Sequence, residues 1–327
     1  MAVDVLLFWV ALGAYLVSTI LYTLYFAFQR PTILYAARAG MAIGFLSHTI
    51  AIVGRAADVG HMPVTNLYEY VSLFAWSVVL GYWVAVWKVR KPLLGPFVAP
   101  VAFTMIVVAS LFPKDANQQL VPALQSYWLQ IHVTLAVLGE GAFAVAFAAS
   151  VTYVMKSGRR SGVILAGAIT SLLLGGIFLA IWQKLAPLAA LKDGAVLPFL
   201  GVAVLLALPF FGAQIALANG IRKKLPDLDQ LDEIAYRGIA IGYPLFFIGA
   251  LLAGAVWAHH AWGKIWGWDP KEVGALVVFL IYSAYLHARA SHGWRGQRAA
   301  VLSVIGFAAA IFTLFGNLVL GGLHAYN

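Results

Sequence analysis

Ten runs of about 20 apolar residues each follow one another along this 327-residue chain. A run of this length crosses the hydrocarbon core of a bilayer as a helix, because backbone groups in lipid must be hydrogen-bonded within the structure. Only 10% of the residues are charged, against about 25% in a typical soluble domain. The sequence therefore predicts an all-α, polytopic transmembrane bundle forming one membrane domain over residues 1–327. Its expected spans are about 5–27, 32–54, 67–87, 93–112, 129–155, 161–182, 195–218, 238–259, 272–288 and 300–320.

The distribution of Lys and Arg predicts how the bundle is oriented. With the N-terminus outside, fifteen of the 21 cations lie at inner span ends and six at outer ends, as the positive-inside rule favours. We therefore expect both termini outside. The net charge of +9 follows from this asymmetry and is not a nucleic-acid signal. The six outer cations are Arg55, Lys114, Lys184, Lys192, Lys264 and Lys271.

The chain contains no cysteine. Disulfides, thiolate metal ligands and thiol redox chemistry are therefore excluded within this chain. Any metal or cofactor chemistry must use other side chains, of which the eight histidines are the strongest candidates.

The external segment 260–272 contains the stretch WGKIWGWDPKE, which is too polar and too aromatic to be an ordinary span. An aromatic belt at the membrane interface explains one or two tryptophans, such as Trp257. It does not explain Trp262, Trp266 and Trp268 interleaved with glycines. Glycine leaves the ring faces and the backbone open to a flat ligand. We interpret WGKIWGW as a platform for such a ligand.

The end of the same stretch has a local structural role. Asp269 is a favourable helix N-cap, Pro270 suits the first helical position, and Glu272 stands at the third position, as in a capping box. We therefore expect DPKE to begin the ninth span.

The histidines are unevenly placed in this topology. His132 lies in the first turn of the fifth span and His324 just beyond the last, both on the outer side with the Trp stretch, and His259 and His260 lead into it. A lone interfacial histidine is more often an ordinary polar residue than a ligand, which is our interpretation of His61 and His292. Intramembrane ionisable residues favour function, and His287 and His48 lie inside spans.

A flat, apolar ligand with acidic edges that takes two imidazoles is haem. Its ring would stack on indole, its iron would take histidines, and its propionates would pair with Lys264 and Lys271. From the residues alone, quinone binding and a transporter with an aromatic gate remain open.

The stretch WGKIWGWDPKE resembles the WWD signature of haem-handling proteins in cytochrome c maturation. The wider sequence is similar to the CcsA (ResC) family of the system II pathway. The stretches that carry this similarity cover most of the chain after residue 60: PVTNLYEY (63–70), LQIHVTLAVLGE (129–140), LDEIAYRGIAIGYPL (231–245), YLHARASHGWRGQRAA (285–300) and NLVLGGLHAYN (317–327).

The resemblance implies a subunit of a cytochrome c synthase, or haem lyase, in the bacterial plasma membrane. Such a protein holds haem b at the external, periplasmic face and presents it for thioether attachment to the CXXCH motif of apocytochrome c. The matching positions make His132 and His324 the external axial ligands. They make His287 a ligand of an inner haem site, whose second ligand would come from the CcsB (ResB) partner or from His48.

Three expectations accompany the resemblance. A thiol reductant protein is a further expected partner, and no side chain is assigned as a catalytic group. Family members have about eight spans, so residues 161–218 are expected to form an inserted transmembrane hairpin. Two rival functions remain: a haem exporter or chaperone without lyase activity, and a quinone-binding membrane redox subunit.

Overall fold

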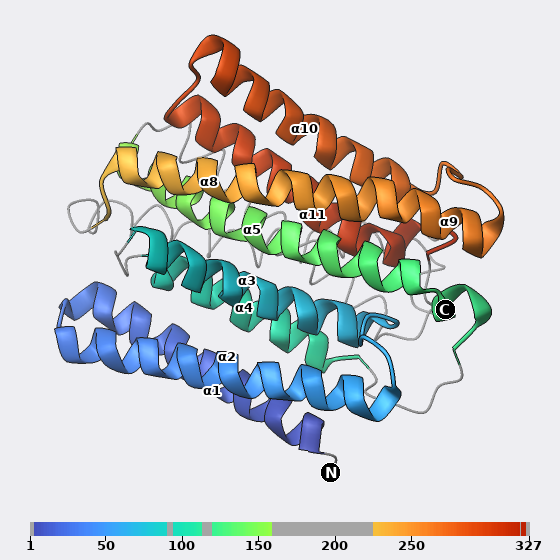
Figure 1. The fold of residues 1–327 in the computed structure, drawn as a ribbon. Coiled ribbons are helices and arrows are strands. Elements are labelled where there is room, and N and C mark those ends of the chain that lie inside the picture. Colours follow the sequence, from blue (N-terminus) through green and yellow to red (C-terminus); the bar gives the residue numbers. More distant parts are fainter. Residues whose placement is uncertain (1–2, 90–93, 113–119, 159–224, 321, 325–327) are drawn as a thin grey trace, which may run out of the picture. The chain divides into compact units, whose positions relative to one another are not determined.

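The computed structural model describes residues 3–89, 94–112, 120–158, 225–320 and 322–324 (Figure 1). Within these ranges every regular element is a helix, which confirms the predicted all-α class. The elements are α1 (Val3–Phe28), α2 (Pro31–Val59), α3 (Leu67–Val89), α4 (Gly95–Ser110), η1 (Pro122–Gln125), α5 (Tyr127–Ser157), α8 (Leu228–Phe246), η4 (Phe247–Ala253), α9 (Gly254–Trp262), α10 (Pro270–His292) and α11 (Gln297–Leu320).

Seven helical stretches among the described residues are long and apolar enough to cross a membrane, and α4 is a shorter apolar helix. They correspond to eight of the ten predicted spans, which confirms a polytopic helical membrane protein. The other two form the predicted hairpin 161–218 and lie outside the described residues. The span predicted at 238–259 begins earlier in the structure, at Leu228, because the amphipathic segment before it continues into the same helix.

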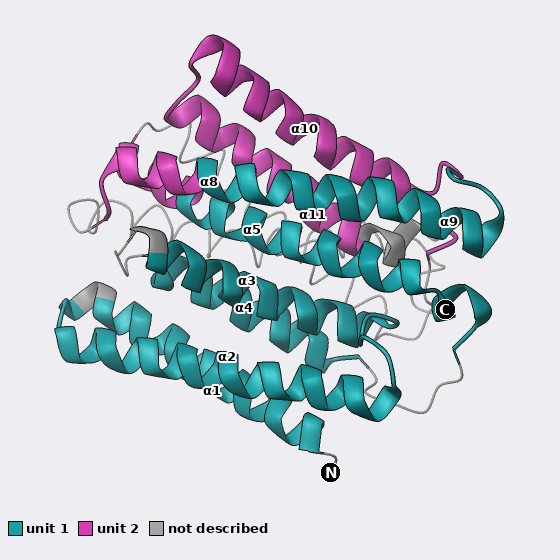
Figure 2. Ribbon diagram, viewed as in Figure 1, with its two compact units in different colours: residues 1–149, 236–266 teal, residues 150–235, 267–327 magenta. Residues whose placement is uncertain are grey.

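The helices group into two compact units (Figure 2). Unit 1 comprises Met1–Ala149 and Tyr236–Trp266, and unit 2 comprises Ser150–Ala235 and Gly267–Asn327. The division passes through α5 and α8, so each of these helices contributes residues to both units.

In unit 1, α1 and α2 form an antiparallel pair joined at Gln29 and Arg30, α1 also contacts α4, and α3 contacts α2 and α4 (Figure 1). Large aromatic side chains fill the space between these helices, and Tyr15, Tyr22 and Tyr82 are fully buried. Their hydroxyl groups need partners in an apolar interior. Tyr22 and Tyr82 provide them for each other, with their hydroxyl oxygens 2.5 Å apart.

Glycines allow α5 to pack closely against the α8, η4 and α9 stretch of unit 1. A Cβ atom on Gly242 would lie 2.8 Å from the carbonyl oxygen of Gly139, and one on Gly238 would lie 2.9 Å from that of Ala142. Small residues at such contacts let transmembrane backbones approach each other and gain van der Waals contact. This close contact fixes the position of the α5 residues that face η4.

In unit 2, α10 packs against α11, and a carboxylate anchors the link between them. Asp232 accepts hydrogen bonds from the Arg289 guanidinium at 2.7 Å and from the backbone N–H of Gly296 at 2.9 Å. The first turns of α8 are thereby fixed to the end of α10 that carries His287.

Candidate haem-ligand site

The Trp stretch forms the connection from α9 to α10. Helix α9 ends at Trp262, where Gly263 takes the left-handed conformation (φ 71°) and its N–H donates to the carbonyl of His259. Trp268 also has a positive φ of 57°. This is unusual for a bulky residue, and such strained backbone gathers at functional sites. Its side chain is 73% exposed, which makes it available to a ligand at the surface.

The predicted capping box at the start of α10 is confirmed. Asp269 Oδ1 accepts from the backbone N–H of Lys271 at 3.0 Å, and Glu272 Oε2 accepts from that of Asp269 at 3.2 Å. Glu272 Oε2 also accepts from the backbone N–H of Gly267 at 2.7 Å. The two carboxylates therefore fix the backbone on both sides of Trp268.

Asp269 also binds the chain segment that follows α11. Its Oδ1 lies 2.8 Å from Nδ1 of His324, and its Oδ2 accepts from the backbone N–H of Leu323 at 2.6 Å. A carboxylate can only accept, so Nδ1 of His324 carries the proton and the lone pair of the neutral ring is on Nε2. Gly322, at φ 111°, makes this approach possible, because a Cβ there would collide with Asp269 Oδ2.

The environment of Asp269 keeps it ionised. Burial by itself would raise the pKa of its carboxyl group. The backbone N–H of Lys271, the electrostatic interaction and hydrogen bond with the His324 ring, and the N–H of Leu323 together outweigh burial and hold that pKa below its ordinary value.

His132, in unit 1, is oriented in a similar way by a different kind of group. Its Nδ1 lies 2.8 Å from the carbonyl oxygen of Gly249 in η4, so Nδ1 must donate and the lone pair is again on Nε2. A Cβ on Gly254 would lie 2.9 Å from this nitrogen, so that glycine provides the space for the ring. Histidines that bind metals commonly donate their other ring nitrogen to a carbonyl or carboxylate. His132 and His324 both meet this requirement for binding haem iron.

A tryptophan outside the predicted platform contacts His132. The Trp257 indole stacks on the His132 ring with centroids 5.7 Å apart and planes 7° from parallel. It also packs edge-on against Trp262 at 4.7 Å, and its indole N–H donates to the carbonyl of Ala123. Sequence analysis assigned Trp257 to an aromatic belt, since no local pattern links it to a histidine 125 positions earlier.

The remaining predicted residues of the segment differ in their exposure. Trp262 and Trp266 are half-buried in unit 1, Lys264 is exposed, and Lys271 is half-buried in the first turn of α10. Their roles as stacking surfaces and propionate partners stay predictions. So does the pairing of His132 with His324, because the two residues belong to different units.

The two intramembrane histidines have contrasting surroundings. His287 is exposed near the end of α10, with its ring centroid 5.8 Å from that of His292. His48 is fully buried, with Nε2 2.9 Å from Ser72 Oγ and Nδ1 3.4 Å from the Tyr15 hydroxyl. Hydroxyl groups therefore contact both nitrogens of His48, and an iron ligand there would have to displace one of them.

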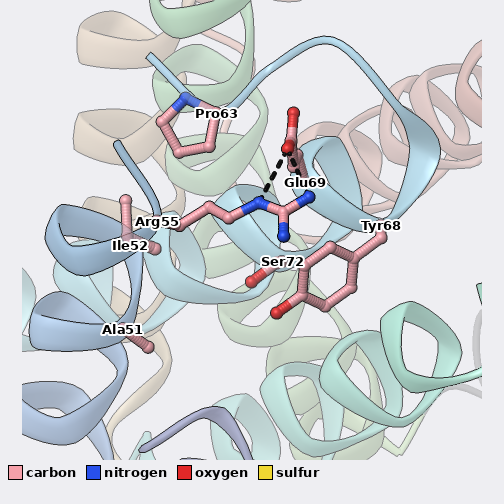
Figure 3. Close-up of a pocket in the computed structure, with 7 residues that line it drawn as sticks. All are labelled: Ala51, Ile52, Arg55, Pro63, Tyr68, Glu69 and Ser72. Carbon is pink, nitrogen blue, oxygen red and sulfur yellow. Dashed lines mark hydrogen bonds and ion pairs between the residues drawn. The ribbon is translucent and has the colours of Figure 1, made fainter. Parts of the chain in front are cut away.

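One predicted outer cation is buried instead. Arg55 lies inside α2, which continues to Val59, and its side chain is 5% exposed. Figure 3 shows its guanidinium pointing at Glu69, with Nε and one terminal nitrogen each 3.0 Å from Oε1. Asp4 lies 3.9 Å from the other terminal nitrogen. An ion pair with Glu69 allows this cation to be buried near the end of α2.

The Arg55 and Glu69 pair lines a small pocket in unit 1. The pocket is also lined by Tyr68, Ser72 and Pro63 (Figure 3). Glu69 also accepts from the backbone N–H and hydroxyl of Thr65, each at 2.9 Å. These bonds fix the PVTNLYEY stretch at the start of α3, which gives it a structural role.

Comparison with known proteins agrees with the family resemblance. The family described as Cytochrome C assembly protein matches residues 64–324. The cytochrome c biogenesis protein CcsA of Gloeobacter violaceus is 36% identical over 333 residues, covering 100% of this chain and 96% of that protein. The CcsA protein of Synechocystis sp. is 34% identical, covering 92% of this chain and 90% of that protein.

A solved structure also matches the fold. The cytochrome c heme lyase CcmF superposes with a TM-score of 0.61 at 16% sequence identity, covering 97% of this chain and 48% of that one. The chain thus spans about half the length of that lyase, and the likeness is one of fold alone. The family match over residues 64–324, with near-full-length relatives at 34% and 36% identity, shows that the chain belongs to the CcsA family of cytochrome c biogenesis proteins.

Proposed function

We propose that this chain binds haem b at its external segment 260–272 and presents it for attachment to apocytochrome c. In this proposal His132 and His324 are the two axial ligands of the iron, and Trp262, Trp266 and Trp268 contact the porphyrin ring. One observation carries the proposal. Each of the two histidines donates its Nδ1–H to an acceptor, so the lone pair of each ring is on Nε2, as iron ligation requires.

The chemistry that follows is the addition of two cysteine thiols across the two vinyl groups of haem. Each sulfur forms a bond to one vinyl carbon, the thiol proton passes to the other, and no further reactant is consumed. The chain contributes proximity and orientation, which are large terms when two reactants must meet in one geometry. Asp269 and Glu272 are both engaged in fixing the segment, so we assign them positioning roles.

The remaining assignments concern partners and the inner side of the membrane. We propose that the chain acts with a CcsB (ResB) subunit as a cytochrome c synthase in the bacterial plasma membrane, with the haem segment on the periplasmic face. A thiol reductant protein would keep the CXXCH cysteines reduced. His287 would bind haem at an inner site, with a second ligand from the partner or from His48.

The test of the external site is the absorbance spectrum of the purified full-length chain. We expect a low-spin haem spectrum that is weakened in His132→Ala and in His324→Ala and is restored by added imidazole. His61→Ala is the matched control, because the described hydrogen bond of that ring is to the Met62 carbonyl of its own loop. A spectrum unchanged in both site variants would contradict the assignment of the ligands.

The test of attachment uses the haem-loaded chain and a reduced CXXCH peptide, with and without the CcsB partner. We expect a thioether-linked product whose haem resists extraction by acid and organic solvent. Normal haem binding without any covalent product, even with the partner present, would instead support a haem carrier without lyase activity.

A further inference from the structure

The two proposed axial histidines are held by acceptors of different charge. His324 donates its Nδ1–H to the carboxylate of Asp269, whereas His132 donates its Nδ1–H to the backbone carbonyl of Gly249. Both nitrogen-to-oxygen distances are 2.8 Å, so the difference is in the acceptor and not in the length of the bond. A hydrogen bond to an ionised acceptor is roughly twice as strong as one between neutral groups.

His324 is fixed by both its ring and its backbone. Asp269 accepts from the His324 ring with one oxygen and from the Leu323 N–H with the other. The imidazole side chain is 8% exposed and that of Asp269 is 1% exposed. Since Asp269 is itself fixed as the N-cap of α10, the His324 ring has little freedom to turn away from its position.

His132 is held by a carbonyl that has a second donor. Gly249 belongs to the π-helical turn η4, and its carbonyl also accepts from the backbone N–H of Gly254. Turns of π-helix are rare and are often found at functional sites. The Trp257 indole stacks on the His132 ring with the two planes 7° from parallel. The acceptor of the His132 Nδ1–H is therefore a neutral carbonyl that a second donor shares.

Donor strength follows from these acceptors. A carboxylate on Nδ1–H draws the proton away from the ring and makes Nε2 a stronger donor to a metal. A neutral carbonyl increases the donor strength of Nε2 less. The incoming histidine of CXXCH must replace one axial ligand, so one iron–nitrogen bond breaks as another forms and no electron is transferred.

We propose that His132 is the axial ligand that departs when apocytochrome c binds, and that His324, strengthened by Asp269, is the ligand that stays. This inference rests on the proposed function, because it presumes that both histidines bind iron. It assigns Asp269 as a positioning residue that determines the order of ligand exchange.

Carbon monoxide tests this assignment, because it binds reduced haem iron by replacing one axial ligand. The C–O stretching frequency then reports the donor strength of the ligand that remains opposite. We expect the frequency of the wild-type complex to coincide with that of His132→Ala, in which only His324 remains. Coincidence with His324→Ala, or two bands of similar weight, would overturn the inference.

A second pair of variants uses proteins that keep both histidines. Asp269→Asn retains the size of the side chain and a good N-cap, but removes the charge behind His324. We expect it to shift the C–O frequency, raise the reduction potential and weaken haem binding by about 10- to 100-fold. Glu272→Gln is the matched control, since Glu272 completes the same capping box without contacting His324 in any described hydrogen bond. Equal effects of the two substitutions would mean that Asp269 acts only as a helix cap.

The outcomes separate this inference from the proposed function. Absence of a low-spin spectrum in the wild-type protein would contradict the haem site as a whole. A normal wild-type spectrum that both histidine substitutions weaken, together with a carbon monoxide complex that retains His132, would contradict only the order of exchange.

Discussion

At the scale of single residues, Asp269 connects the local and the tertiary structure of the site. Its two oxygens accept from the backbone of Lys271, the backbone of Leu323 and the ring of His324. The first bond follows from its position in the sequence, one residue before Pro270. The other two join it to a segment more than 50 positions later, so this helix cap also positions the ring that we propose as a metal ligand.

The depressed pKa of Asp269 predicts how this connection responds to acid. A carboxyl group whose pKa is lower in the folded state stabilises that state above its unfolded pKa, and the contribution is lost as the pH falls through the folded pKa. The ordinary value is 3.8. We therefore expect wild type to be more stable than Asp269→Asn at about pH 6, and the difference to shrink as the pH falls further below about 4.

Thermal unfolding in detergent, followed by circular dichroism across this pH range, measures the difference. Asp229→Asn removes an exposed acid from the first turn of α8 and serves as the control for loss of one carboxylate. A stability difference between wild type and Asp269→Asn that widens as the pH falls would show that folding does not lower the pKa of Asp269.

At the scale of elements, the π-helical turn η4 is what brings a carbonyl to His132. Close packing against α5 holds that turn in place, because a Cβ on Gly249 would lie 2.7 Å from Leu135 Cβ and would collide with the backbone N–H of Ala136. Sequence analysis predicts an apolar span here but not the π-helical turn. Hydrophobicity specifies that a segment is buried in lipid or protein, and it does not specify which helix comes into backbone contact.

Gly249→Ala is expected to separate η4 from α5. We expect a loss of about 1–3 kcal/mol in the free energy of unfolding, as for other overpacked cores. We also expect weaker haem absorbance per protein, because the Gly249 carbonyl moves away from His132. Both effects are measurable on the purified chain, as a melting temperature and a spectrum.

Gly13→Ala is the matched control for this substitution. Gly13 is also helical and apolar in its surroundings, but a Cβ there has no atom within 4 Å. Alanine in an open helical position stabilises by roughly 0.5–1 kcal/mol relative to glycine. Equal losses in the free energy of unfolding of the two variants would show that the effect of Gly249→Ala does not come from the contact between α5 and η4.

At the scale of the whole molecule, the chain is a membrane bundle in which two helices, α5 and α8, each contribute to both compact units. The predicted orientation depends on the 15 to 6 distribution of Lys and Arg. The outward position of both termini stays a prediction.

Deletion of residues 161–218 tests the predicted topology. Removing a pair of spans preserves the side on which every later segment lies, so alkaline phosphatase fused at the C-terminus should remain active. This enzyme needs the oxidising compartment outside the membrane for its disulfides. Deletion of residues 195–218 alone removes one predicted span and should abolish the activity. Activity that is lost in the first variant and kept in the second would contradict the inserted hairpin.

The sequence by itself determined the class of fold, the seven described helices that are long enough to span a membrane and the capping box at α10, and it indicated which histidines are candidate ligands. All of these depend on rules that act over a few residues: the length of an apolar run, the chemistry of a helix cap, and the cost of an ionisable group in lipid. The family resemblance narrowed the eight histidines to His132 and His324 as external ligands.

Only the tertiary structure decided how those histidines are held. The bond from His132 to Gly249 spans 117 positions, and that from His324 to Asp269 spans 55. Neither hydrogen bond can be predicted from the local sequence pattern, because each depends on which segments pack together and on glycines that let them approach. The same reason accounts for Trp257 and Arg55, whose partners are distant in sequence. Local sequence patterns indicate the candidate residues of the site, and packing determines which group accepts the hydrogen bond of each histidine.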